Sequence, residues 1–356
     1  MGMGKGFFNN RNRAKPPKLE YYQGREVMLN PKVFGEGFKS KTLPVSFIFG
    51  SGGVGDYISW SAAIKFIQET QPHVDGRLFV SELFIDVARY LFQAKEGWKV
   101  ELKDNFWEHY EEGSQVNFPK QGTQLINACG AHLIDLGAMY YACEQNLPPE
   151  YDFLPEINYE GPWKWPELDP TKPYALFTPG ATTAVRELPH DIFTECVNYT
   201  LSKGITPVFL GKRDLSIRYM ANFQGDLSKG IDLRERTTLL EATQLMRGAK
   251  FIIGLDNGLL HMAGTTKCPI IFGHNIALAE RRAIRRREGL TVDVTVSEDE
   301  LACIGCQDKI RFARNHSFKE CFFKGKANEL ACHVYLGKDK AKRWKDAIDK
   351  VLEHGK

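Results

Sequence analysis

Two glycine-containing stretches carry the residues that are best placed for chemistry, and the first surrounds Asp56. The apolar run at 45–49 is followed by glycines, among them Gly53 and Gly55, and then by Asp56 at the start of a predicted helix. Gly50 and Gly55 have the spacing of a Walker A loop, but that loop continues with lysine, and a carboxylate here would repel a phosphate. A carboxylate at this place suits a proton acceptor better than a phosphate contact, and the glycines let a ligand approach the backbone. The alternative is that Asp56 only caps the helix.

The second stretch, GLDNGLLHMAG at 254–264, has the features of a diphosphate site. A predicted strand ends there and a helix begins near Gly258, so free backbone N–H groups and the helix dipole can hold a diphosphate. Asp256 is placed to accept hydrogen bonds from sugar hydroxyls, and His261 lies one turn into the helix on the side of Asn257. The alternatives are that Asp256 and Asn257 only cap the helix and that His261 is an ordinary helix histidine.

The loop TPGATTAVRELP at 178–189 offers a second set of ligand contacts. Gly180, Thr182 and Thr183 supply donors beside the end of a predicted strand. Arg186 suits a phosphate, because the guanidinium fork matches two phosphate oxygens. The alternative is that Arg186 is an ordinary surface arginine.

The elements that position these residues form two similar α/β halves. Strand and helix signals alternate along the chain, which favours parallel sheets with crossover helices. A proline-rich stretch at 156–173 interrupts the alternation and is typical of a linker. Two such halves place a cleft between them, which is the usual ligand site. The predicted strands are 45–49, 77–84, 124–128, 174–180 with its turn, 206–211 and 250–254, and the predicted helices are 57–68, 190–202, 238–247 and one from about 258.

Three segments resemble glycosyltransferase family 9, the heptosyltransferases, in their order and spacing. They are GVGDYISWSAAIKF, PGATTAVRELPHDIF and DLRERTTLLEATQLMRGAKFIIGLDNGLLHMAGTTKCP, and the resemblance covers about residues 45–275. It implies a GT-B fold, with the acceptor on the first Rossmann-like domain and the sugar nucleotide on the second. It also implies inversion of the anomeric centre without a catalytic metal.

The resemblance assigns roles to individual residues. Asp56 matches the family's proposed general base, and Arg186 matches a basic residue that contacts the donor diphosphate. The residues that match the donor-binding loop are Asp256, Asn257, Gly258 and His261. Glu187 and Leu188 depart from the family, which commonly has a basic and an aromatic residue there, so the resemblance leaves the nucleotide sugar open.

The predicted fold class is therefore α/β, with two Rossmann-like domains in a GT-B fold facing a cleft and a C-terminal four-cysteine finger. We divide the chain into a basic N-terminal extension (1–43), an N-terminal acceptor-side domain (44–160), a C-terminal sugar-nucleotide-binding domain (161–295), and the cysteine finger with a closing helix (296–356).

Four cysteines near the end of the chain have the spacing of a metal site. They are Cys303, Cys306, Cys321 and Cys332. Four thiolates suit structural zinc or iron, and reduced free thiols are the alternative. The segment is similar to the iron-binding finger of the protein heptosyltransferases that modify autotransporters. We expect a structural metal whose loss leaves sugar-nucleotide binding at the separate domain intact. The remaining cysteines, which are Cys129, Cys143, Cys196 and Cys268, are predicted core thiols.

The composition is that of a globular protein with an uneven charge. Of 356 residues 43% are hydrophobic, no apolar stretch is long enough to span a membrane, and no secretory signal is present, so we expect a cytoplasmic protein. Residues 1–42 hold nine Lys/Arg and three Asp/Glu, a balance of +6 within a net charge of +3. This basic segment is either a solvated tail or a contact for an acidic acceptor, a nucleic acid or a membrane surface. The basic cluster at 281–287 could serve similarly or bind a nucleotide.

The predicted function is an inverting glycosyltransferase that moves a sugar, with heptose as a candidate, from a nucleotide-diphosphate donor to an acceptor hydroxyl. The acceptor stays open between a glycan, a protein and a modified nucleic acid, and a homo-oligomer is a further expectation. One alternative is a dinucleotide-dependent oxidoreductase, because Gly50, Gly52 and Gly55 have the GxGxxG spacing of a dinucleotide-binding loop. Glu82 would then bind the ribose, although it lies 27 residues after Gly55 rather than about 20. The other is a non-catalytic sugar- or nucleotide-binding scaffold.

Overall fold

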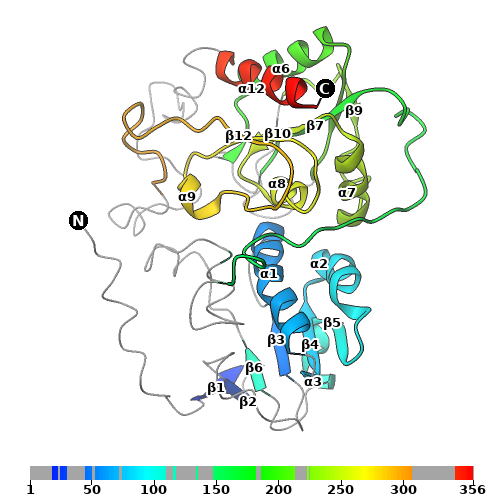
Figure 1. Ribbon diagram of the computed structural model, residues 1–356, viewed down its shortest axis with the longest axis vertical. Helices are drawn as coiled ribbons and strands as arrows, with labels where there is room; N and C mark the ends of the chain where they lie inside the picture. The colour runs from blue at the N-terminus through cyan, green and yellow to red at the C-terminus, as the bar shows by residue number, and fades with distance from the viewer. Residues whose placement is uncertain are drawn as a thin grey trace. The chain divides into compact units, whose positions relative to one another are not determined.

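The protein consists of two compact α/β units, Met1–Pro155 and Glu156–Lys356, each built on one six-stranded sheet (Figure 1). The structure is a computed structural model. It describes residues 18–22, 25–29, 45–49, 53–71, 74–109, 115–117, 134, 147–181, 186–212, 223, 225–306 and 341–355. Both sheets are mainly parallel, so the predicted α/β class is confirmed. No helix in these ranges is both long and apolar enough to cross a membrane.

The first unit has the strand order β1-β2-β6-β3-β4-β5. β1 and β2 pair antiparallel, and the other neighbours pair parallel. Aromatic rings fill the core beside β3, where Phe49 stacks on Trp60 with ring centroids 5.9 Å apart. The strands are β1 (Lys18–Tyr22), β2 (Arg25–Leu29), β3 (Val45–Ile48), β4 (Gly76–Val80), β5 (Trp98–Leu102) and β6 (Gln115–Asn117). The helices are α1 (Val54–Thr70), α2 (Glu82–Ala88), the π-helix η2 (Arg89–Gln93), the 3-10 helix η3 (Lys103–Asn105) and α3 (Phe106–His109).

Two features of the first unit differ from the sequence-based expectations. The predicted strand 77–84 stops at Val80, because Ser81 is an extended N-cap and α2 then buries Phe84, Ile85 and Val87 on one helical face. Within the predicted basic extension, Lys18–Tyr22 and Arg25–Leu29 form two strands of the sheet. The predicted strand 124–128 lies outside the described residues.

The second unit has the strand order β12-β11-β10-β7-β8-β9, and all neighbours pair parallel. The predicted linker 156–173 contains no helix or strand and packs on this unit: Trp165 is buried, and the amide of Ile157 donates to the Thr265 carbonyl (2.9 Å). The strands are β7 (Tyr174–Thr178), β8 (Thr206–Phe209), β9 (Ile231–Asp232), β10 (Ile252–Leu255), β11 (Ile270–Gly273) and β12 (Thr291–Asp293). The helices are α6 (His190–Ser202), α7 (Leu239–Gly248), α8 (Gly258–Ala263), α9 (Ala279–Arg282) and α12 (Lys342–His354).

The end of the chain shares the hydrophobic core of the second unit. α12 buries Trp344, Ile348 and Val351 in the same cluster as the strand residue Ile271. α12 lies beside α6, and Lys203 of α6 forms an ion pair with Asp349 of α12 (2.7 Å). The closing helix therefore belongs to the second unit, while the division of the chain into four domains stays a prediction, since 307–340 lie outside the described residues.

Candidate functional site

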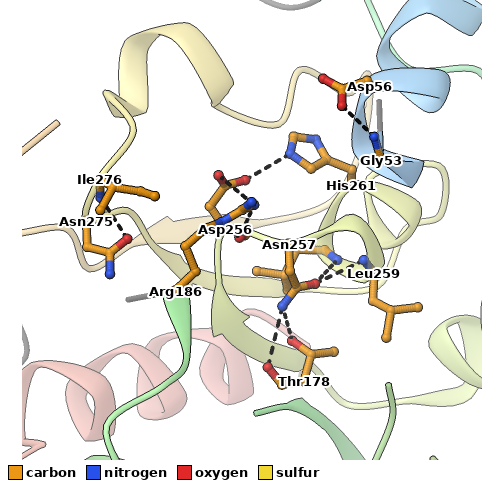
Figure 2. Close-up of polar contacts among 11 residues, drawn as sticks. Gly53, Asp56, Thr178, Arg186, Asp256, Asn257, Leu259, His261, Asn275 and Ile276 are labelled. Atoms are coloured by element: carbon orange, nitrogen blue, oxygen red, sulfur yellow. Dashed lines mark hydrogen bonds and ion pairs between the residues drawn. The ribbon is translucent and has the colours of Figure 1, made fainter. Parts of the chain in front are cut away.

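The turn between β10 and α8 is held by Asn257, which caps α8. Its Oδ1 accepts hydrogen bonds from the amides of Leu259 (3.0 Å) and Leu260 (3.2 Å), and its Nδ2 donates to Thr178 Oγ1 (3.0 Å) (Figure 2). The capping interpretation is thus correct for Asn257. The expectation of several free amides at this helix start is wrong, because Asn257 occupies two of them. The amide of Gly258 has no acceptor among the described residues.

Asp256 is a buried carboxylate between a guanidinium and an imidazole. Its side chain is 5% exposed, its Oδ2 lies 3.1 Å from Arg186 Nη2, and its Oδ1 lies 3.2 Å from His261 Nε2 (Figure 2). Burial alone would raise the pKa of Asp256, but the charge of Arg186 and the hydrogen bond from His261 outweigh it and hold the pKa well below its usual range. Asp256 is therefore ionised. Since a carboxylate only accepts hydrogen bonds, Nε2 of His261 carries the hydrogen.

Arg186 is held by Asp256 along one edge of its guanidinium. Nε (2.9 Å) and Nη2 (2.5 Å) both donate to the Asp256 carbonyl, and Nη2 also donates to the carboxylate. Nη1 has no partner in the described part of the chain, and the side chain is 19% exposed. The arginine is thus oriented before any ligand binds, and it retains one edge for a ligand. It is not the ordinary surface arginine that the sequence allowed.

Two further titratable side chains, His274 and Arg282, lie near Asp256, and only Arg282 belongs to a stretch that the sequence singled out, the basic cluster at 281–287. β10 and β11 pair with Leu255 opposite Gly273, and the amide of Asp256 donates to the Gly273 carbonyl (3.0 Å), so His274 follows directly beside Asp256. His274 and Arg282 are both buried; the charge of Arg282 helps to lower the pKa of Asp256, as that of His274 would if the ring were protonated. Burial lowers the pKa of His274, so the ring is neutral near pH 7. Only the sheet order, in which β11 neighbours β10, could have indicated His274.

The loop after β7 carries Gly180 and the buried Glu187. A Cβ added to Gly180 would meet no atom of the described residues within 4 Å, so none of these residues requires glycine there. Thr182 and Thr183 lie outside the described residues. Glu187 is 7% exposed, and its Oε1 has no hydrogen-bond partner among the described residues. Burial raises the pKa of Glu187 to about 7.

Asp56 occupies the first turn of α1, in the first unit. Its Oδ2 accepts a hydrogen bond from the Gly53 amide (2.7 Å), which caps the start of α1, and the side chain is half-buried. Oδ1 has no partner among the described residues. Gly55 lies in the same turn, and a Cβ on Gly53 would come no closer than 3.9 Å to Asp56 Oδ2. Asp56 is therefore a cap, as one interpretation predicted, and it keeps one carboxylate oxygen for chemistry.

The CxxC pair lies on a turn at 302–306 in the second unit. Cys306 is buried and Cys303 is half-buried, and Gly305 between them has φ +70°. Cys321 and Cys332 lie outside the described residues, and within those residues no three His, Cys, Asp or Glu side chains are grouped as a metal site requires. The four-cysteine finger stays a prediction. The other cysteines that the structure describes, Cys196 and Cys268, are buried thiols whose pKa burial raises to about 12, as core cysteines should be.

The sequence of the second unit matches a known family. Residues 151–274 match the model of glycosyltransferase family 9 (heptosyltransferase). The match includes the loop with Arg186 and the turn with Asp256. It confirms the resemblance and the prediction that the chain is a glycosyltransferase rather than an oxidoreductase. No curated protein sequence matches the chain.

Solved glycosyltransferases have a similar fold. One is the bacterial iron-containing dodecameric glycosyltransferase TibC from enterotoxigenic E. coli H10407, with a TM-score of 0.64, 15% identity, and coverage of 88% of this chain and 77% of that chain. Another is TibC in complex with ADP-D-β-D-heptose (TM-score 0.64, 16% identity, 94% and 81% covered). A third is the E. coli ADP-heptose LPS heptosyltransferase II (TM-score 0.54, 13% identity, 88% and 99% covered). These similarities confirm the GT-B fold.

Proposed function

We propose that this chain, with its family 9 match at 151–274, transfers a sugar from a nucleotide-diphosphate donor to an acceptor hydroxyl with inversion of the anomeric centre. ADP-heptose is the first donor to test, because it is the ligand in the TibC complex. The observation that carries the proposal is the pair formed by Asp256 and Arg186. The ionised carboxylate holds one edge of the guanidinium and leaves the other edge open.

The open edge of Arg186 suits the donor diphosphate. Nη1 of Arg186 and the free amide of Gly258 are two donors on neighbouring loops, and a guanidinium binds phosphate oxygens well. Each oxygen of the Asp256 carboxylate accepts one hydrogen bond within the chain and has capacity for a second, from a sugar hydroxyl. Gly180 and the predicted contacts Thr182 and Thr183 belong to the loop that carries Arg186.

The proposed chemistry uses Asp56 as the general base. Its free Oδ1 takes the proton of the acceptor hydroxyl while that oxygen forms a bond to the anomeric carbon. The bond from the anomeric carbon to the diphosphate oxygen breaks on the opposite face, and the nucleoside diphosphate leaves with the electron pair. The transition state resembles an oxocarbenium ion, and Arg186 stabilises the charge that grows on the leaving group. Gly53 and Gly55 leave room for the acceptor at the start of α1.

The cysteines are assigned a structural role in this proposal. One iron or zinc ion would be held by four thiolates, which fill a tetrahedral shell and leave no open position for substrate. TibC is described as iron-containing. The described half of the set is compatible with this role, because Cys303 and Cys306 flank a turn whose Gly305 adopts the left-handed conformation. The remaining ligands would be Cys321 and Cys332.

Assembly and acceptor are further parts of the proposal. TibC is described as dodecameric, so a homo-oligomer is the first quaternary state to test. A glycan, a protein and a modified nucleic acid all present hydroxyl acceptors. A cytoplasmic location stays a prediction.

The proposal is tested by donor binding and by transfer, measured separately. A thermal-shift panel of ADP-heptose and other sugar nucleotides should reveal a ligand, since a ligand at about 100 times its Kd stabilises the folded state by about 2.7 kcal/mol. Arg186→Ala should abolish that shift. A non-catalytic scaffold would bind a donor but would neither hydrolyse it nor transfer its sugar to any class of acceptor. If the protein binds none of the sugar nucleotides, the proposed donor site is refuted.

A further inference from the structure

The turn that carries the CxxC pair packs directly on the chain segment that follows β11. The amide of Gly305 donates to the Asn275 carbonyl (2.7 Å). Gly305 has φ +70°, and a Cβ added there would lie 2.2 Å from Leu278 Cδ2 and 2.6 Å from its Cγ. Both the backbone conformation and the close approach therefore require glycine at this position. Ile304 anchors the turn in the core of the second unit.

The segment that Gly305 contacts is the one that places buried groups beside Asp256. His274 and Asn275 come directly after β11, the strand that pairs with β10. The side chain of Asn275 fixes the local turn, because its Oδ1 accepts a hydrogen bond from the Ile276 amide (2.7 Å) (Figure 2). The amide of His274 donates to Thr295 Oγ1 (2.8 Å). The same segment continues into α9, which ends at Arg282. A shift of this segment would therefore move His274 and Arg282 relative to Asp256.

We propose that Gly305 is a positioning residue for nucleoside-diphosphate binding: its close contact with Asn275 and Leu278 fixes the 274–282 segment, and through it the surroundings of Asp256. The inference rests on the proposed function, because the donor site meant is that of Asp256 and Arg186. It assigns the cysteine turn a role in donor affinity that the sequence did not indicate. This proposal differs from the sequence-based expectation, in which donor binding is retained when the cysteine segment loses its metal.

The coupling works in both directions. If the cysteine turn changes the affinity for a nucleoside diphosphate, the nucleoside diphosphate must stabilise the cysteine turn by the same factor. This reciprocity provides a measurement on the unaltered protein as well as on variants.

The first test is a substitution with a matched control. Gly305→Ala adds the Cβ that meets Leu278, whereas Gly204→Ala adds a Cβ at a similar φ of +72° that meets nothing within 4 Å. The affinities for ADP, GDP, UDP and CDP are measured by calorimetric titration. For at least one of them, the affinity of Gly305→Ala should be about 5- to 150-fold lower than that of the unaltered protein, which is the usual range of coupling between sites. The affinity of Gly204→Ala should be unchanged. The double variant Gly305→Ala/Leu278→Ala removes the clashing atoms, and we expect it to recover most of the lost affinity. A merely destabilised protein would not regain affinity in this way.

The outcomes separate this inference from the function on which it rests. If none of the four diphosphates binds the unaltered protein, both the proposed function and this inference fail. If one binds, and folded Gly305→Ala binds it as tightly as Gly204→Ala does, the proposed function stands and this inference is wrong.

A second measurement applies if Gly305→Ala does not fold. Hydrogen exchange of the unaltered protein should slow at 301–306 when the diphosphate that binds is added at saturation, while the segment around Gly204 exchanges as before. Unchanged exchange at 301–306 would overturn the inference.

Discussion

Removal of Arg186 should destabilise the second unit far more than removal of a comparable arginine in the same unit. In Arg186→Ala the Asp256 carboxylate, which is 5% exposed, loses its counter-ion, and the Asp256 carbonyl loses two hydrogen bonds. Removing one partner of a buried ion pair costs about 3–5 kcal/mol. Because the Arg186 side chain is itself 19% exposed, we expect the lower end, about 3 kcal/mol. In a unit of this size that corresponds to a fall in Tm of about 6–12 °C.

The matched control is Arg234→Ala. Arg234 also forms a paired contact with an aspartate, Asp232, through Nε and Nη2 at 3.0 Å each, but the pair is local in sequence and the Asp232 side chain is 26% exposed. Arg234 itself is 15% exposed, but water can reach the Asp232 carboxylate once the arginine is removed, so its loss should cost less, about 1 kcal/mol. Urea denaturation of both variants, and of Arg186→Ala/Asp256→Asn, measures the difference. Equal losses for the two arginines, or no recovery in the double variant, would refute the assignment of Asp256 as a buried ionised group that depends on Arg186.

Three further predictions concern the loops and the cysteines. Because burial raises the folded-state pKa of Glu187 from 4.5 to about 7, the stability linked to Glu187 is complete below about pH 4.5 and is lost as the pH rises through 7. The free energy of unfolding, measured by denaturation at pH 5 and pH 8, should therefore fall less between these two pH values in Glu187→Gln than in the unaltered protein. Equal falls in the two proteins would contradict this assignment. Gly180→Ala should leave the Tm unchanged, since the added Cβ meets no atom of the described residues within 4 Å, but it should weaken binding of a nucleoside diphosphate that approaches this backbone. Unchanged affinity in calorimetry would show that the donor does not bind at Gly180. Elemental analysis should find about one iron or zinc ion per chain that Cys303→Ser/Cys306→Ser loses, and protein prepared anaerobically without chelators that holds no metal would rule out the finger.

Local patterns in the sequence predict the second unit well. The helix predicted at 190–202 is observed as α6, His190–Ser202, and Gly204 follows it with φ +72°, as a C-terminal cap should. The helix predicted at 238–247 begins one residue later because Thr238 is its cap, in a capping box with Glu241. These elements depend on residues close in sequence, which is why their type and limits can be predicted.

Contacts between distant segments could not be predicted in this way. His274 lies beside Asp256 only because β11 neighbours β10 in the sheet, an order that no local pattern determines. The contact of Gly305 with Leu278 likewise depends on how a later turn packs on an earlier segment. The error at 77–84 has another cause: the run Leu83–Ile85 is apolar, and a short apolar run fits a buried strand and a helix face equally well. The motifs therefore predicted Arg186, Asp256 and His261, and the order of the strands adds His274 to the candidate site.

The most direct test of the account is the transfer rate of Asp56→Asn. The asparagine oxygen can still accept the Gly53 amide that Asp56 Oδ2 accepts at 2.7 Å, so the cap of α1 and the fold should persist. Asp191→Asn, which changes another first-turn aspartate on α6, is the control. With a donor and acceptor that the unaltered protein uses, Asp56→Asn should bind the donor with unchanged affinity and transfer sugar about 10²–10⁴-fold more slowly. Transfer at the rate of the unaltered protein would contradict the account and leave Asp56 as a helix cap alone.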